Sequence, residues 1–190
     1  MIALDSSAAL LLIDVQVGLD EPRLGQRSNP DAEANMARLL AEWRAKARPI
    51  FHVQHMSTEP NSPLRPELPG NAIKGIVAPQ GDEPVIQKQV SNAFVGTELE
   101  ARLRRAGVRA VIVVGLTTEH CVSSTARMAS DLGFTTLVVA DATACHDRTG
   151  FDGVYTPAED IHRLALVGLQ DEFAEIVTTE VLLSAKIHEA

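Results

Sequence analysis

The chain has 190 residues, and 45% of them are hydrophobic, which is enough apolar side chain for the packed core of one domain. We therefore expect a single domain over residues 1–190. The formal net charge of −8 disfavours nucleic acid or an anionic membrane as a partner, because either would repel a negatively charged surface. A small-molecule substrate or another protein is therefore the favoured kind of partner.

The apolar runs are too short for a membrane span, which requires roughly 20 consecutive residues. Asp5 and Asp14 bracket the run nearest the N-terminus, unlike the basic flank of a secretory signal, so a cytoplasmic protein is expected. Two cysteines, Cys121 and Cys145, are too few for a disulfide framework. In a reducing compartment each is expected to be a free thiol.

Short apolar runs alternate with amphipathic segments along the whole chain. The near-continuous hydrophobicity of these runs predicts strands that are buried on both faces, as in a parallel sheet. The expected strands cover residues 8–15, 49–55, 84–87, 110–115, 135–140 and 174–178. The stretch from 57 to 83 is rich in proline and glycine, and a connection of this length inside a domain is more often functional than idle.

Five helical patterns lie between and after the expected strands. They cover residues 31–47, 98–106, 119–132, 157–171 and 179–186. The first pattern places Met36, Leu39, Leu40, Trp43 and Ala47 on one face. Thr97 and Thr156 each open a Ser/Thr-x-x-Glu sequence, which predicts a helix start with a capping box. The alternation predicts an α/β fold with a doubly wound sheet and helices on both of its faces.

Three chemically reactive residues follow three separate predicted strands: Asp14, Lys88 and Cys121. Open parallel sheets bind ligands outside the carboxyl ends of their strands, so these residues are expected to meet at one edge. Each alone has a simpler interpretation, as a turn-forming acid, a solvated lysine or a buried structural cysteine. Their combination favours a catalytic site.

Cys121 is the most informative of the three. A helix that begins near Glu119 would place this thiol in its first turn. There the positive helix end is expected to lower the thiol pKa below its ordinary value. The N–H groups of the same turn could also hold the oxyanion of a tetrahedral intermediate.

Other pairs of reactive residues are less favourable. His120 adjoins Cys121, but consecutive helical residues point about 100° apart, so His120 is expected at the pocket mouth and not as the base. Cys145 and His146 lie in a loop with no helix start behind them, and we interpret Cys145 as structural or solvent-facing.

The remaining histidines do not indicate a metal centre. His52 and His55 should face opposite sides of one strand, and no Asp or Cys lies near them in sequence to complete a ligand set. No glycine-rich phosphate-binding loop follows any predicted strand. No metal and no other cofactor is therefore expected.

Residues 10–16 (LLLIDVQ), 85–104 and 113–134 together resemble the isochorismatase-like cysteine hydrolases. This superfamily includes nicotinamidases, N-carbamoylsarcosine amidohydrolases and ureidoacrylate or maleamate amidohydrolases. The likeness continues through residues 138–166. It implies a three-layer α/β/α sandwich around a six-stranded parallel sheet. It also implies an Asp-Lys-Cys triad, which falls on Asp14, Lys88 and Cys121.

The resemblance further implies a cis peptide bond before Thr117 and an oxyanion hole formed by the amides of Thr117 and Cys121. In the implied mechanism Asp14 accepts the thiol proton, Lys88 holds the Asp14 carboxylate, and the thiolate attacks an amide-type carbonyl. Asp14 then protonates the leaving amine, and water releases the acid from the thioester. The candidates for substrate-binding residues are Gln16, Phe94, Glu119 and His120.

Two departures from the family pattern narrow the expected reaction. Nicotinamidases carry a metal-binding Asp-Trp-His after the second strand, where this chain has His55-Met56-Ser57. True isochorismatases cleave a vinyl ether without needing the thiol, so Cys121 favours an amide or a related C–N substrate. The alternatives are an isochorismatase-type vinyl ether hydrolase and a non-catalytic binding or thiol redox-sensing module. A homo-oligomer, either dimer or tetramer, is implied by the resemblance alone.

Overall fold

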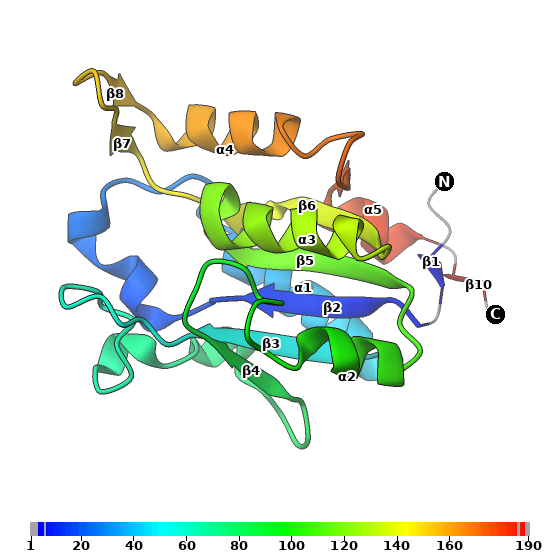
Figure 1. Ribbon diagram of the computed structural model, residues 1–190. Helices are drawn as coiled ribbons and strands as arrows, with labels where there is room; N and C mark the ends of the chain where they lie inside the picture. The colour runs from blue at the N-terminus through cyan, green and yellow to red at the C-terminus, as the bar shows by residue number, and fades with distance from the viewer. Residues whose placement is uncertain (1–3, 6, 186, 189–190) are drawn as a thin grey trace.

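The computed structural model describes residues 4–5, 7–185 and 187–188, and its centre is a six-stranded parallel sheet (Figure 1). The strands lie in the order β4-β3-β2-β5-β6-β9. Their bounds are β2 Ala9–Ile13, β3 Ile50–His55, β4 Val85–Lys88, β5 Ala110–Leu116, β6 Thr135–Ala144 and β9 Glu175–Val177. The predicted α/β fold with a six-stranded parallel sheet is confirmed.

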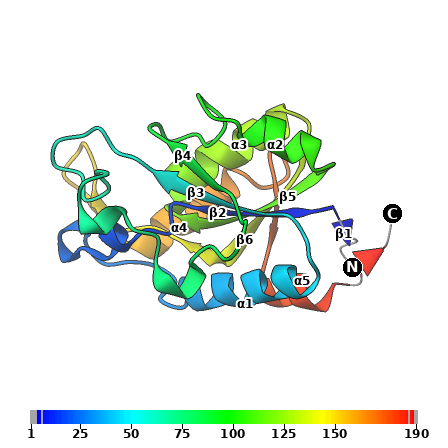
Figure 2. The same ribbon diagram turned by 90° about the horizontal axis from the view of Figure 1, so that it is seen from below.

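Helices cover both faces of this sheet, which makes the three layers seen in Figure 2. One face packs against α1 (Ala32–Ala45) and α5 (Thr179–Ser184). The other packs against α2 (Leu99–Arg105), α3 (Ser123–Asp131) and α4 (Ala158–Val167). In the described part of the chain, no helix has both the length and the apolar character needed to cross a membrane.

Strand β2 illustrates why the sequences of the strands are continuously apolar. Leu10 and Leu12 pack into the core beside α1, whereas Leu11 and Ile13 pack into the core on the other face. Successive side chains of a strand point to opposite faces, so a strand covered on both sides needs an apolar residue at every position. The Trp43 indole of α1 is buried in the core on the α1 side of the sheet, and it donates a 2.9 Å hydrogen bond to the Ala8 carbonyl.

Several helix ends differ from the predicted ones. Ala47 lies beyond α1, exposed and with a left-handed φ of 48°, so its predicted place on the buried face is wrong. The predicted capping boxes do not form. Helix α2 starts one residue later than predicted, and the Thr97 hydroxyl accepts from Leu99 N (3.2 Å). Helix α4 starts after Pro157 without a side-chain cap and ends at Val167.

The strand order places a crevice at the carboxyl ends of β2 and β5. The chain runs outward from β2 through β3 to β4 on one side, and from β5 through β6 to β9 on the other. The switch point of a doubly wound sheet is its usual ligand site. In Figure 1 the loops of this edge lie at the left, together with the hairpin of β7 (Arg148–Thr149) and β8 (Tyr155–Thr156). The short pair of β1 (Leu4–Asp5) and β10 (Ile187–His188) lies at the opposite end.

Candidate active site

The structure brings together the three residues that follow separate strands. Asp14 comes directly after β2 in a left-handed conformation (φ 49°), Lys88 ends β4, and Cys121 lies in the turn after β5. Lys88 Nζ is 2.6 Å from Asp14 Oδ2 and 3.3 Å from Cys121 Sγ. An acid, an ammonium and a thiol therefore share one edge of the sheet.

Burial distinguishes this lysine from the solvated lysine of the simpler interpretation. Lys88 is 2% exposed and Asp14 is 1% exposed. Two charges withdrawn from water this far are tolerated only when they are paired, and removal of either one leaves the other uncompensated. Asp14 Oδ1 is also buried, and it has no hydrogen-bond partner among the residues that the structure describes.

His55 is a further member of the cluster that sequence reasoning missed. Its Nδ1 lies 3.0 Å from Lys88 Nζ, and the ligand atoms of Asp14, His55 and Cys121 lie within 4.8 Å of one another. No Asp or Cys lies near His55 in sequence, but distant strands bring both close to it in space. His55 ends β3, so the rule that selected the other three residues could have found it.

These atoms have the spacing of a metal-ligand set, but a cation of the chain already lies among them. The Lys88 ammonium is within 3.3 Å of an Asp14 oxygen, a His55 nitrogen and the Cys121 sulfur. A divalent ion bound to the same three atoms would have to displace it. The donor set therefore fits an internal ammonium better than a metal.

The pKa of the Cys121 thiol differs from the sequence-based expectation. Burial raises the pKa of Cys121 to about 12; the Asp14 carboxylate adds to this effect, and Lys88 opposes it. The prediction that the helix start lowers the thiol pKa is wrong, because desolvation outweighs it. Burial also raises the pKa of Asp14, against the opposing charge of Lys88. The resting Cys121 thiol is thus protonated at neutral pH and lies beside Asp14.

The turn that carries Cys121 is not the start of a regular α-helix. Residues Thr118–Val122 form one π-helical turn, and α3 begins at Ser123, so the predicted start near Glu119 is corrected. The Leu116–Thr117 peptide bond is cis, as the family resemblance implies. The Thr117 carbonyl accepts from His120 N (3.1 Å) and Val122 N (3.2 Å), on either side of the Cys121 amide.

A small cavity of about 160 Å³ opens onto this cluster. Ligand sites for drug-sized molecules typically span about 300–1,000 Å³, so this cavity suits a small substrate. Four leucines line it together with the polar groups. The lining residues are Asp14, Leu19, Leu24, His55, Leu64, Leu116, Thr117, His120, Cys121, His146 and Arg148.

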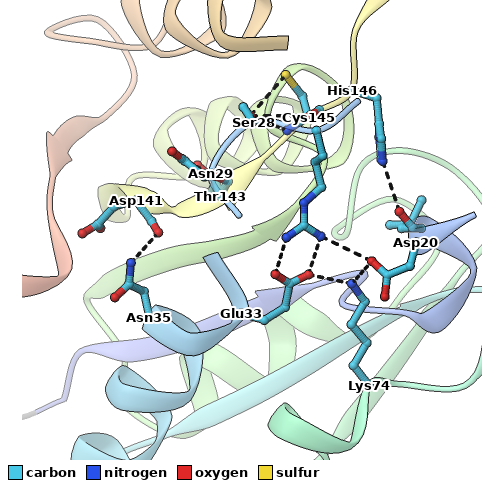
Figure 3. A network of polar contacts seen from close by, with 12 residues as sticks. Asp20, Ser28, Asn29, Glu33, Asn35, Lys74, Asp141, Thr143, Cys145 and His146 are labelled. Atoms are coloured by element: carbon cyan, nitrogen blue, oxygen red, sulfur yellow. Dashed lines mark hydrogen bonds and ion pairs between the residues drawn. The ribbon is translucent and has the colours of Figure 1, made fainter. Parts of the chain in front are cut away.

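An ionic cluster, shown in Figure 3, includes Asp20, which follows the cavity-lining residue Leu19 in the chain. The Arg27 guanidinium donates to both Glu33 oxygens (2.6 and 2.5 Å), and Lys74 Nζ bridges Glu33 and Asp20 at 2.6 Å each. Although burial opposes it, these hydrogen bonds lower the pKa of Glu33 to about 2. The cluster ties residues 17–28 to α1 and to the 57–83 connection.

The predicted substrate-binding residues lie in different places. His120 is on the cavity wall, whereas Gln16, Phe94 and Glu119 are not among the residues that line it. The Phe94 ring stacks on Phe134, with centroids 6.2 Å apart. Glu119 is mostly buried and accepts a 3.0 Å hydrogen bond from Arg148. Both side chains therefore lie outside the lining of this cavity, and their role in substrate binding stays a prediction.

The Gln16 side chain also lies outside the lining of the cavity, and its amide is hydrogen-bonded to the backbone. Its Oε1 accepts from His55 N (2.8 Å), and its Nε2 donates to the carbonyls of His55 (3.0 Å) and Asn71 (2.8 Å). A side chain with its acceptor and both donors so engaged has little capacity left for a substrate. It holds the end of β3 in place.

Cys145 lies apart from this site. It is fully buried, its Sγ donates to the Ala158 carbonyl (3.2 Å), and burial raises its pKa to about 11. Figure 3 shows it beside Ser28, whose hydroxyl accepts from Cys145 N (3.1 Å). The structural interpretation of this thiol fits its surroundings better than the solvent-facing one.

Comparison with known proteins agrees with this architecture. The sequence profile of the isochorismatase domain matches residues 8–181. The chain is 40% identical over 181 residues to an uncharacterized isochorismatase family protein, YrdC, of Bacillus subtilis, covering 95% of this chain and 97% of the relative. Maleamate amidohydrolase of Pseudomonas putida is 32% identical over 104 residues, which cover 55% of this chain and 44% of that enzyme.

Solved structures lead to the same family. A crystal structure of an isochorismatase family protein from Chromobacterium violaceum superimposes with a TM-score of 0.92 at 39% identity, covering 97% of each chain. The family profile, the sequence relative and the solved structure all match nearly the whole chain and indicate the same family. The chain is a member of the isochorismatase family of hydrolases.

Proposed function

We propose that this hydrolase cleaves a small amide-like C–N bond through a thioester on Cys121. The observation that carries the proposal is the contact of one buried ammonium with both an acid and a thiol. Lys88 Nζ lies 2.6 Å from Asp14 and 3.3 Å from Cys121. Covalent catalysis requires a nucleophile next to a base, and a third group that orients the base. Here Cys121 is the proposed nucleophile, Asp14 the base and Lys88 the orienting group.

In the first half-reaction Asp14 acts as the base. It takes the proton of the Cys121 thiol while the sulfur attacks the substrate carbonyl and forms a C–S bond. Asp14 Oδ1, buried and without a partner among the described residues, is the oxygen suited to receive this proton. The amides of Thr117 and Cys121 are proposed to stabilise the oxyanion.

The remaining steps complete acylation and then, in the second half-reaction, return every group to its starting state. Protonated Asp14 gives its proton to the leaving nitrogen as the C–N bond breaks, which leaves the acyl group on sulfur. Asp14 then accepts a proton from water, the oxygen attacks the thioester, and the acid departs. The sulfur finally regains a proton from Asp14. Lys88 takes no part in these proton transfers and holds the Asp14 carboxylate in place.

A raised thiol pKa is consistent with this sequence of steps. A thiol of pKa about 12 is not a preformed thiolate at neutral pH, so the proton must leave as the sulfur attacks. A neighbouring carboxylate whose pKa is itself raised is better matched to accept that proton than a solvated Asp. The sequence similarity to maleamate amidohydrolase also supports a C–N substrate.

The test is a panel of small amides, carbamoyl compounds and isochorismate, followed for ammonia or acid release. The proposal expects turnover of at least one C–N compound and its loss in Cys121→Ala. Cleavage of isochorismate that persists in Cys121→Ala would indicate vinyl ether hydrolysis instead. No turnover, together with reversible peroxide oxidation of Cys121, would indicate a redox-sensing module.

A further inference from the structure

His55 and Lys88 are register partners on β3 and β4, and their side chains meet next to the reacting groups. We propose that His55 is a positioning residue, which holds the Lys88 ammonium against Asp14 and Cys121 by accepting its third hydrogen bond. The inference rests on the proposed function, because it assigns His55 a task in the same site. None of the proton transfers described above uses this imidazole.

The hydrogen-bond capacity of the ammonium supports this assignment. A lysine ammonium has three N–H donors and no acceptor. Its three neighbours are Asp14 Oδ2 at 2.6 Å, His55 Nδ1 at 3.0 Å and Cys121 Sγ at 3.3 Å. Three acceptors for three donors fix the rotation of the group about its last bond. Without His55 one buried N–H would lack a partner, or the ammonium would turn away from the weakest acceptor, the sulfur.

The assignment requires a neutral imidazole with its lone pair on Nδ1. Burial lowers the pKa of His55, and the adjacent Lys88 charge lowers it further, against a smaller opposing effect of Asp14. The imidazole also has a hydrogen bond with the backbone of Val90. Because Nδ1 faces the ammonium, the ring proton belongs on Nε2. The other titratable groups on the cavity wall are Cys121, His120, His146 and Arg148.

The backbone of His55 is held as firmly as its ring. The Gln16 amide bonds both His55 N (2.8 Å) and the His55 carbonyl (3.0 Å), and Asn71 Nδ2 donates to the same carbonyl (2.8 Å). On the next strand, the Lys88 carbonyl accepts from Met56 N at 2.7 Å. The imidazole is thus presented at a fixed place, which a positioning group needs.

The experiment compares how fast iodoacetamide alkylates Cys121 and Cys145 at pH 9, read from the two cysteine peptides by mass spectrometry. His55→Leu removes the acceptor at similar volume. His55→Asn returns an oxygen or nitrogen near the Nδ1 position, whereas His55→Gln places it near Nε2. His52→Leu is the matched control, since His52 lies on the same strand and contacts Glu83 (2.9 Å) instead of the site.

The inference expects Cys121 alkylation to slow by about tenfold in His55→Leu, the effect of losing one hydrogen bond to a charged group. Cys145 alkylation should be unchanged, His55→Asn should recover most of the rate, and His52→Leu should leave Cys121 as in the parent protein. If His55→Leu does not fold, His55→Gln takes its place. A variant that only loosens the fold would instead speed up both thiols.

Two results would overturn the inference: Cys121 alkylation that is as fast in His55→Leu as in the parent protein, or equal rates in His55→Asn and His55→Gln. Alkylation needs no substrate, so failure of this inference is separate from failure of the amide screen. With an amide substrate in hand, His55→Leu should lower kcat about tenfold, and His55→Asn should recover most of this loss, because the imidazole acts through the Lys88 ammonium.

Discussion

The ammonium nitrogen of Lys88 lies 2.6 Å from Oδ2 of Asp14, although the two residues are 74 positions apart in sequence. The ends of β2 and β4 supply them, with β3 between these strands. Both side chains are almost completely withdrawn from water, so each charge is tolerated only because the other is present. The pair therefore connects the stability of the fold with the chemistry of the site.

Removal of one member of this pair is predicted to destabilise the protein. Lys88→Met should lower the free energy of unfolding by about 3 kcal/mol, because it leaves the Asp14 carboxylate buried without a counterion. Urea denaturation at pH 7 measures the change. The double variant Asp14→Asn with Lys88→Met should recover much of the loss without recovering activity. Equal stability of Lys88→Met and the parent protein would contradict the pairing.

The two thiols are predicted to differ in reactivity because only one faces a cavity. Iodoacetamide should modify Cys121 about tenfold faster than Cys145, which is fully buried against Ser28 and the Ala158 carbonyl. The rate at Cys121 should keep rising with pH through pH 9 and above, since its pKa is raised to about 12. Equal labelling, or a rate at Cys121 that levels off near neutral pH, would be inconsistent with this environment.

The acid side of the pH profile should report Asp14. The proposed first step needs the carboxylate, so activity is present above the Asp14 pKa and is lost as the pH falls through it. Burial raises that pKa above its ordinary value of 3.8. The acid limb of kcat/KM is therefore expected at a higher pH than an ordinary aspartate would give, and Asp14→Asn should be inactive at every pH. A limb at or below the ordinary value would mean that Asp14 is not the base.

The ionic cluster around Glu33 should stabilise the fold in a pH-dependent way. The pKa of Glu33 falls from 4.5 to about 2 on folding, so its contribution is present above about pH 4.5 and is lost as the pH falls towards 2. A shift of this size corresponds to about 3 kcal/mol, and Glu33→Gln should lose a similar amount at pH 7.

Glu180→Gln is the matched control for this prediction. Its carboxylate is 76% exposed and pairs with Arg38 across 3.0 Å at the surface. A solvent-screened pair contributes little, so the variant should change the free energy of unfolding by less than about 1 kcal/mol. Thermal or urea unfolding of both variants at pH 7 and pH 4 makes the comparison. Similar losses in the two variants would show that burial of the Glu33 cluster is not what stabilises it.

Sequence patterns predicted the sheet and most of the acid–ammonium–thiol cluster because both depend on where strands end. Asp14, Lys88 and Cys121 follow buried apolar runs, and parallel strands present their carboxyl ends at one edge. His55 also lies at the carboxyl end of a strand. Its sequence neighbours give no sign of the site, because the groups that contact it come from other strands. The spatial contacts of a histidine cannot be read from its local sequence.

The remaining differences come from burial and from irregular backbone. The direction of the Cys121 pKa depends on how much water reaches the sulfur, which no spacing of residues encodes. Three of the four leucines of the cavity wall, Leu19, Leu24 and Leu64, come from sequence segments without helical or strand periodicity. Gln16 is near the site in sequence and in space, yet its amide faces the backbone of His55. Hydrogen-bond partners of this kind become visible only with the folded chain.

The central claim is that Cys121 carries the acyl group of the substrate. The most direct measurement is mass spectrometry of protein quenched in acid during turnover of the best amide from the panel. We predict that the peptide containing Cys121 gains the mass of the acyl group, that the peptide containing Cys145 stays unmodified, and that Cys121→Ala is inactive. Undiminished turnover in Cys121→Ala, with no acyl group on the parent protein, would contradict the account.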